Sequence, residues 1–325
     1  MRGQTLRNAL LLAVAAVSAS LEVPRLQHES LDAATAAIAN APAAIGRAVA
    51  NAASHAGESH LGFDTNMYPG DKAMSAWKRD GQYEWVGYYL QAPCHKDESW
   101  SGERQHLVDN GWGLAVIYVG QQTWGKRLDA AGTTGSKTSH AQRHSSRSHK
   151  KRSTHTMRRS SKTPVAAASD RCSASFVNAA HGTLDAADAI AEAQHEGFPR
   201  GTVVFLDVEY MDVLPQPMRD YYRAWARALL ADGRYRPGIY AHTHNASTIY
   251  DDVSAVYASA GIGDDPPFWI AGKGDFSPDS SLPTEVGHEF ASVWQGMLDV
   301  VRTHNGVRLP IDISVASVAS PSLVQ

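Results

Sequence analysis

The chain has 325 residues, 43% of them hydrophobic, with 8 Trp and 12 Tyr, which is enough for one large domain or two small ones. The net charge of −3 averages two unlike parts, because residues 132–171 hold ten Lys and Arg against one acid. That segment carries +9 and the remainder −3 − 9 = −12, which argues against nucleic-acid binding as the main role of the body.

The N-terminus has the pattern of a secretory signal peptide. Arg2 and Arg7 precede an apolar run at 9–17 that is too short to span a bilayer, and small residues around Ala19 offer a cleavage site. A buried core helix is the alternative. No other stretch approaches the ~18 apolar residues of a membrane helix. We therefore expect residues 1–20 to be removed and the mature protein to be secreted, periplasmic or associated with the cell envelope.

Residues 21–60 are rich in Ala and poor in large apolar side chains, which indicates a linker or pro-segment before a folded body at 61–320. Two cysteines, Cys94 and Cys172, fit an exported protein and would be able to pair in an oxidising compartment. Neither lies in a CxxC motif, so we expect no Cys-based metal site.

From residue 61 onward, apolar segments of strand length alternate with helical patterns. The alternation implies parallel βαβ units, and eight units in about 260 residues fit the α/β class as a (β/α)8 TIM-like barrel, in regular or modified form. A doubly wound open sheet is the alternative. Residues 62–66 lack the Gly-rich fingerprint of a dinucleotide site. The predicted strands are 61–64, 85–90, 114–119, 202–209, 238–242, 268–271, 292–295 and 310–314, and the helices are 71–80, 102–110, 184–196, 217–231 and 246–260.

The strand at 202–209 ends in two acids, Asp207 and Glu209. Residues i and i+2 of a strand point to the same face about 7 Å apart, and two neighbouring carboxylates do not both ionise easily, so one pKa should rise. An acid with a raised pKa can protonate a leaving oxygen while its neighbour stays charged, which is the chemistry of glycosidic bond cleavage. The alternative is a strand end with two solvated acids.

The active site of a barrel lies where its strands end. We therefore expect four acids near strand ends to form the catalytic group, namely Asp64, Asp207, Glu209 and Asp312. Aromatic faces stack on sugar rings, although core packing is the alternative for each aromatic alone. The predicted substrate-binding residues are Tyr118, Gln121, Tyr240, His242, Trp269, Trp294 and Gln295.

Six short motifs follow one another along the body: Gly62-Phe63-Asp64, Tyr118-Val119-Gly120-Gln121-Gln122, Asp207-Val208-Glu209, Gly238-Ile239-Tyr240, Trp294-Gln295 and Ile311-Asp312-Ile313-Ser314. In this order they resemble a glycoside-hydrolase-like domain of unknown function from secreted mycobacterial and actinobacterial proteins, which is similar to the family 25 lysozymes (muramidases). The resemblance covers residues 61–320 apart from an insert, and it implies a modified barrel with a sugar-active cleft.

The resemblance also implies roles for the acids. Glu209 would be the proton donor, in a substrate-assisted route in which the N-acetyl oxygen of the sugar attacks its own anomeric carbon. Asp207 would orient and stabilise that amide. Asp64 and Asp312 would tune both pKa values and bind substrate hydroxyls.

Residues 132–170 form a low-complexity insert rich in Ser, His, Lys and Arg, which we expect to be disordered. Its charge predicts an anionic polymer or membrane surface as partner, and a solvated loop without a partner is the alternative. The adjacent cations oppose a zinc or copper site on its four histidines. The insert follows the third strand, so Cys94 and Cys172 would lie near one rim, where a disulfide would pin its end.

These observations predict a secreted glycoside hydrolase-like protein that cleaves amino-sugar polymers of the cell wall, such as peptidoglycan. We expect a monomer that needs no cofactor, metal ion or obligate nucleic-acid partner. A non-catalytic carbohydrate-binding or wall-binding module on the same barrel is the main alternative. A nucleic-acid binder acting through the insert is a third possibility, opposed by the acidic body.

Overall fold

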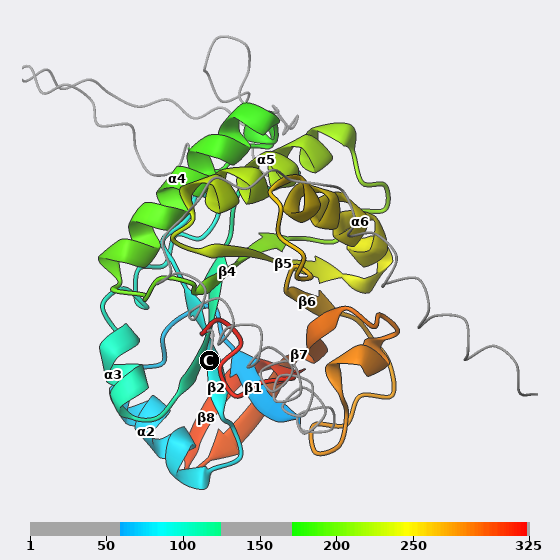
Figure 1. Ribbon diagram of the computed structural model, residues 1–325. Coiled ribbons are helices and arrows are strands. Elements are labelled where there is room, and N and C mark those ends of the chain that lie inside the picture. Colours follow the sequence, from blue (N-terminus) through cyan, green and yellow to red (C-terminus); the bar gives the residue numbers. More distant parts are fainter. Residues whose placement is uncertain (1–58, 125–170, 324–325) are drawn as a thin grey trace, which may run out of the picture. The chain divides into compact units, whose positions relative to one another are not determined.

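The computed structural model describes residues 59–124 and 171–323 (Figure 1). The predicted signal peptide at 1–20, the linker up to residue 58 and the insert at 132–170 lie outside the described residues, so they stay predictions. Within the described residues, eight strands close a barrel in chain order. This confirms the predicted barrel and rules out the open sheet.

The strands are β1 (His60–Asp64), β2 (Trp85–Tyr89), β3 (Gly113–Tyr118), β4 (Val203–Val208), β5 (Arg236–His242), β6 (Phe268–Ala271), β7 (Ala291–His304) and β8 (Val307–Ala316). The helices are α2 (Asp71–Asp80), α3 (Arg104–Asp109), α4 (Ala179–His195), α5 (Gln216–Asp232) and α6 (Thr243–Ser259), with short 3-10 turns η2 (Ala174–Phe176) and η3 (Pro283–Val286). Among these helices, none is both long enough and apolar enough to cross a membrane.

The last strand makes the barrel irregular. Strands β1 to β7 are parallel, whereas β8 runs antiparallel to both β7 and β1. β7 and β8 form a hairpin whose turn contains Asn305 and Gly306, both with positive φ, as in the Asn-Gly turns that suit tight hairpins. Both strands are much longer than the predicted 292–295 and 310–314, because the hairpin extends beyond the barrel wall.

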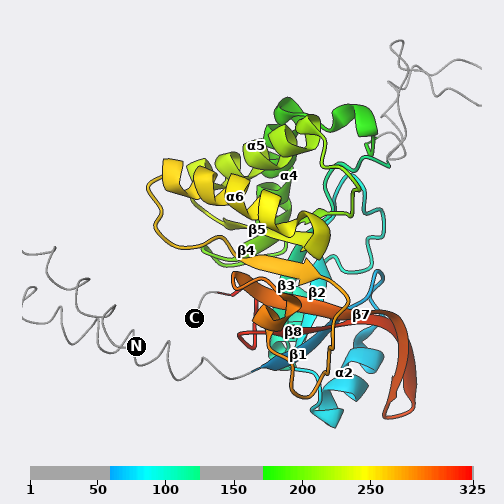
Figure 2. The ribbon, with the colours of Figure 1, turned by 90° about the vertical axis from the view of Figure 1, so that its right-hand side faces the viewer.

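Helices α4, α5 and α6 lie together on one side of the barrel, and α2 lies with the β7–β8 hairpin on the opposite side (Figure 2). Helix α5 shows why the sequence forms helices here. Its buried side chains recur at helical spacing, and Gly233 ends it in the left-handed conformation. The buried residues of α5 are Met218, Tyr221, Tyr222, Ala224, Trp225, Ala226 and Leu229.

The hairpin packs on α2. The Trp77 indole N–H donates to the Val307 carbonyl at 3.1 Å, and the Asn305 amide donates to the Ala76 carbonyl at 2.7 Å. Between β6 and β7 the described chain forms only the 3-10 turn η3. The hairpin and α2 therefore cover a part of the barrel that a regular repeat would cover with a helix.

Large aromatic rings fill the barrel interior, and glycines make room for them. A Cβ on Gly62 would lie 2.1 Å from the Trp85 indole. Trp85 and Phe205 both meet Trp269 edge to face, with ring centroids 5.4 and 5.9 Å apart. This packed layer is a rigid floor beneath the carboxyl ends of the strands.

A short segment after β8 completes the other end of the barrel. β3 and β4 pair from Val116 and Val204 onward, and Ser322 lies beside the earlier part of both strands. The Ser322 hydroxyl accepts from the Val116 N–H at 2.6 Å, and its carbonyl accepts from the Val203 N–H at 2.7 Å. Backbone groups that the two strands leave unpaired are thereby satisfied.

Candidate functional site

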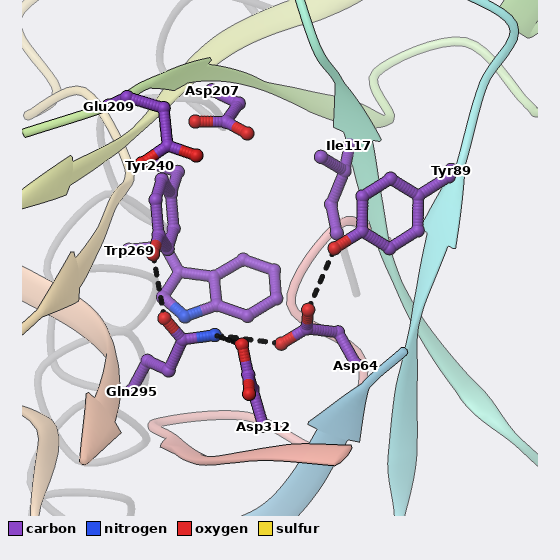
Figure 3. Close-up of a pocket in the computed structure, with 9 residues that line it drawn as sticks. All are labelled: Asp64, Tyr89, Ile117, Asp207, Glu209, Tyr240, Trp269, Gln295 and Asp312. Carbon is purple, nitrogen blue, oxygen red and sulfur yellow. Dashed lines mark hydrogen bonds between the residues drawn. The ribbon is translucent and has the colours of Figure 1, made fainter. Parts of the chain in front are cut away.

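A small pocket opens at the carboxyl ends of the parallel strands (Figure 3). Each strand contributes one side chain, and the loop after β4 adds Glu209. The lining residues are Asp64, Tyr89, Ile117, Asp207, Glu209, Tyr240, Trp269, Gln295 and Asp312. The pocket therefore brings together all four predicted acids and three of the predicted binding residues.

Asp64, at the end of β1, is the most enclosed of these acids, with 6% of its surface exposed. Its carboxylate accepts hydrogen bonds from the Tyr89 hydroxyl at 2.7 Å and the Gln295 amide at 2.9 Å. Burial, followed by repulsion from Asp312, raises the pKa of Asp64 from 3.8 to about 7, although both hydrogen bonds oppose the rise. Near neutral pH this acid is therefore poised between its two protonation states.

Asp207 lies inside the pocket at the end of β4. The Gln122 amide holds its backbone carbonyl at 2.9 Å, but its buried Oδ1 has no hydrogen-bond partner among the described residues. Burial, then repulsion from Glu209 and Asp64, raises the pKa of Asp207 well above its usual range. Burial therefore favours the protonated form of Asp207, whereas the sequence suggested that the neighbour of Glu209 would stay charged.

Glu209 lies just beyond the end of β4, and its side chain is the most exposed of the four acids. Desolvation of its carboxyl by the surrounding protein raises its pKa, and a backbone hydrogen bond from Tyr210 opposes the rise. Glu209 thus combines access from solvent with a raised pKa, which are the two properties that a general acid requires.

Asp312 faces Asp64 directly across the β1–β8 pairing. It lies within β8 and not at its end, because β8 runs in the opposite direction to the other strands. Burial raises the pKa of Asp312, while a 2.6 Å hydrogen bond from the Asp299 N–H lowers it. The Gln295 amide also reaches Asp312, at 3.4 Å, so Gln295 links the acids of β1 and β8.

Trp269 and Tyr240 form an aromatic wall of the pocket. Trp269 is 1% exposed, and its ring meets Tyr240 edge to face at 5.7 Å. The Tyr240 hydroxyl donates to Gln295 at 2.7 Å. The Trp269 indole N–H has no partner among the described residues. The pocket lining therefore includes an unpaired buried donor on Trp269 and an unpaired buried acceptor on Asp207.

Tyr118 and Trp294 were predicted to bind substrate, but neither lines the pocket. Each is the neighbour of a pocket residue in a strand, and successive side chains of a strand point to opposite faces. Tyr118 is buried outside the barrel and donates to Asp188 at 2.9 Å, and Trp294 packs against Phe276. Both rings belong to the packing around the barrel.

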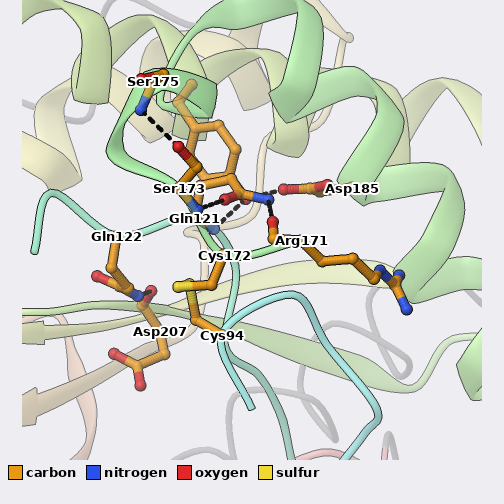
Figure 4. Close-up of a disulfide and its surroundings, with 10 residues drawn as sticks. Cys94, Gln121, Gln122, Arg171, Cys172, Ser173, Ser175, Asp185 and Asp207 are labelled. Atoms are coloured by element: carbon orange, nitrogen blue, oxygen red, sulfur yellow. Dashed lines mark hydrogen bonds between the residues drawn. A yellow bond between two sulfur atoms is a disulfide. The ribbon is translucent and has the colours of Figure 1, made fainter. Parts of the chain in front are cut away.

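Gln121 and His242 also lie outside the pocket lining. The Gln121 side chain donates to the Arg171 carbonyl and accepts from the Ser173 N–H, both at 2.9 Å, so it holds the chain that leads into α4 (Figure 4). His242 caps α6, because its Nδ1 accepts from the His244 N–H at 3.1 Å. The polar atoms of both side chains therefore form hydrogen bonds with backbone groups.

Tyr89 and Ile117 line the pocket although the sequence prediction did not include them. The alternation within β2 was a signal for Tyr89, whereas β3 is apolar on both faces and gave none for Ile117. Tyr89 shares the face of Trp85 in β2, and Ile117 takes the position before Tyr118 in β3. Tyr89 matters more for the chemistry, because it donates directly to Asp64.

Cys94 and Cys172 form a disulfide (Figure 4). It joins the loop after β2 to the chain just before η2, across a sequence separation of 78 residues. The same stretch is held by Gln121. The two ends of the described chain that flank residues 125–170 are therefore fixed at one side of the pocket face.

In residues 59–124 and 171–323, no three His, Cys, Asp or Glu side chains form a group that could hold a metal ion. The pocket acids come from β1, from β4 and the loop after it, and from β8, and the Asp64 carboxylate accepts from the neutral donors Tyr89 and Gln295. The arrangement suits proton transfer and hydrogen bonding to a polar ligand.

A family model described as Rv2525c-like, glycoside hydrolase-like domain matches residues 75–316. No curated protein matches the chain.

Solved structures are similar at low identity, and the three alignments described next each cover 79% of this chain. An uncharacterized B. stearothermophilus protein has 16% identity, a TM-score of 0.48 and 95% of its chain covered. A Streptomyces coelicolor lysozyme has 14% identity, a TM-score of 0.42 and 91% of its chain covered. The Tat-secreted Mycobacterium tuberculosis protein Rv2525c has 14% identity, a TM-score of 0.40 and 93% of its chain covered. At these values the likenesses carry no argument about chemistry.

Proposed function

The chain belongs to the family of Rv2525c-like, glycoside hydrolase-like domains, and on that premise we propose that it is an exported hydrolase of amino-sugar polymers of the cell wall. The observation that carries the proposal is the convergence of four carboxyls with raised pKa values in one pocket. Among the residues that the structure describes, no Lys or Arg lines this pocket, so these acids share protons with one another and with a ligand. Paired acids in different protonation states are what glycosidic bond cleavage needs.

Glu209 is the proposed general acid. It protonates the glycosidic oxygen as the bond from that oxygen to the anomeric carbon breaks. In the second half of the reaction the resulting carboxylate takes a proton from the water that attacks the same carbon. Its raised pKa and its exposure at the pocket rim support this assignment.

Asp207 and Trp269 are the proposed binding groups for an acetamido substituent. An acetamido group has one N–H donor and one carbonyl acceptor, and the pocket holds one buried acceptor and one buried donor without partners. Leaving such groups unpaired costs about 1–3 kcal/mol each, so a ligand that pairs them gains affinity. The proton of Asp207 passes to solvent water when the glycan binds. As the acetamido oxygen then attacks the anomeric carbon, positive charge develops on the group, and the Asp207 carboxylate stabilises that charge.

Asp64 and Asp312 are the proposed electrostatic partners of this pair. Repulsion between them raises the pKa of Asp64, and the charge of Asp64 in turn raises the pKa of Asp207. Protonation of Asp64 near neutral pH therefore controls how readily Asp207 ionises.

The test is turnover of peptidoglycan and of N-acetylglucosamine oligomers by the purified, oxidised protein, with product masses. Glu209→Gln keeps the shape of the side chain but cannot donate a proton, so it should lower the rate by about 10²–10⁴-fold while glycan binding remains. Wild-type activity in the Glu209→Gln variant would refute the assignment. A wild-type protein that binds these glycans without turning them over would instead be the binding module considered from the sequence.

A further inference from the structure

Tyr210 follows Glu209 directly, yet nothing in the acid chemistry uses it. Its side chain is 49% exposed, which is high for an aromatic ring in this protein. A half-exposed aromatic ring contributes little to the core. Its neighbours nevertheless hold it in one position.

Three side chains brace the Tyr210 ring. His242 meets it edge to face with centroids 5.0 Å apart, and His244 is tilted against it at 5.5 Å. The Tyr210 hydroxyl donates to Asp212 at 2.6 Å. The two histidines are also fixed, because the His244 N–H donates to the His242 ring and the His244 ring contacts the Asp212 carbonyl at 3.1 Å.

The loop itself is clamped to the start of α6. The buried Asn245 side chain donates to the Met211 carbonyl at 3.0 Å and accepts from the Met211 N–H at 3.1 Å. Because Met211 is two residues from Glu209, the clamp fixes Tyr210 and the general acid together. Fixing an exposed ring costs conformational entropy that its burial does not return, so the rigidity points to a ligand.

We propose that Tyr210, supported by His242 and His244, is an aromatic ledge that stacks against the sugar neighbouring the pocket-bound residue of a glycan. One face of a pyranose ring consists largely of C–H groups, which pack on an aromatic ring as other apolar surfaces do. Tyr210 follows the pocket residue Glu209 in the chain, and His242 ends β5 two residues after the pocket residue Tyr240, so the ledge adjoins the pocket at β4 and β5. Burial and the nearby His244 lower the pKa of His242, which favours the neutral form of this histidine.

The opposite side of the pocket has a different character. A second groove shares Asp64, Tyr89 and Asp312 with the pocket and continues over Thr65, Asn66 and Asp299. Pro310 and Ile311 also line it, and among the described residues Tyr89 is its one aromatic ring. A sugar that needs a stacking surface would therefore find it on the side of Tyr210.

The inference takes its class of ligand, an amino-sugar polymer, from the proposed function. Binding measurements test the ledge, and turnover measurements test the hydrolysis, so the two can fail independently. Calorimetry with N-acetylglucosamine oligomers of one to six units should give wild-type affinity that rises when a second or third sugar is added. Tyr210→Ala should remove about a 3- to 10-fold gain for the longer oligomers and leave the monosaccharide unchanged. Tyr210→Phe retains the ring and should bind as wild type does.

Val213→Ala is the matched control, because Val213 is an exposed apolar residue of the same loop and is 80% exposed. It should bind as wild type does. Equal affinities of Tyr210→Ala and wild type for every oligomer would overturn the ledge. That result would leave the proposed hydrolysis by Glu209 unaffected. Loss of the length-dependent gain in a protein without turnover would support the ledge and reject hydrolysis. A wild-type protein that binds none of the oligomers would reject the ledge, and turnover of peptidoglycan would then decide the proposed function separately.

Discussion

Replacing Asp64 with Asn should stabilise the protein, and the gain should grow with pH. Asp64 is buried, and its pKa rises from 3.8 to about 7 on folding. The folded state therefore retains a proton that the unfolded chain has lost between these two values. The stability that the protonated acid contributes is complete below pH 3.8 and is lost as pH rises through about 7.

The size of the loss follows from the two pKa values. A difference of about 3 pH units, at about 1.4 kcal/mol per unit, gives about 4 kcal/mol. Asn resembles the protonated acid, because its oxygen can accept from Gln295 while its amide donates to the Tyr89 hydroxyl. Asp64→Asn should thus match wild type near pH 4 and exceed its free energy of unfolding by up to about 4 kcal/mol at pH 8, at the expense of turnover.

The assay is urea unfolding of the oxidised protein at pH 4, 6 and 8, followed by Trp fluorescence. Asp251→Asn, which changes an exposed acid on α6, is the control and should show no such trend. A stability difference between Asp64→Asn and wild type that stays constant from pH 4 to pH 8 would refute the argument. A difference that favours wild type at high pH would mean that the Asp64 charge is stabilised by groups that we have not identified.

Three further predictions concern other parts of the chain. Asp207→Asn should reduce turnover by about 10²–10³-fold, since it removes the charge that stabilises the acetamido group. The measurement is steady-state kinetics with N-acetylglucosamine oligomers, and an unchanged kcat would contradict the prediction. Gly62→Ala should lower the free energy of unfolding by about 1–3 kcal/mol or more, because the new Cβ would lie 2.1 Å from the Trp85 indole. In the control variant Gly263→Ala the new Cβ enters open space, so its free energy of unfolding should stay within about 0.5 kcal/mol of the wild-type value. Deleting residues 132–169 should leave a cooperative urea transition, because the disulfide and Gln121 hold the flanking chain. The deletion should also weaken salt-dependent binding to a teichoic-type polymer, and unchanged binding would rule out the insert as the contact.

The sequence predicts most of the barrel because its strands are short, apolar and separated by clear helical patterns. Helix α2 and strand β6 have the predicted bounds. The β7–β8 hairpin was missed, because residues 296–309 do not form the continuous apolar run that marks a buried parallel strand. The Asn305-Gly306 pair between alternating side chains was the signal for it.

The site divides in a similar way. Acids near the strand ends could be found from position along the chain, and all four line the pocket. The choice between neighbouring residues, such as Tyr118 or Ile117 and Trp294 or Gln295, depends on which face of each strand points inward. A shift of the strand pairing by one residue exchanges the inward and outward side chains. The sequence does not fix this register at strand ends that are apolar on both faces.

The position of β8 and Ser322 has a consequence for how the protein is made. β1 is the first strand of the described chain, and it pairs on one side with β8, some 250 positions later. Ser322 is needed to complete β3 and β4. The native barrel therefore cannot close before β8 and Ser322 have been synthesised, and closure depends on contacts of very large sequence separation, which slow folding. A nascent chain therefore stays open at least until Ser322 has been made, a property compatible with passage across a membrane before folding.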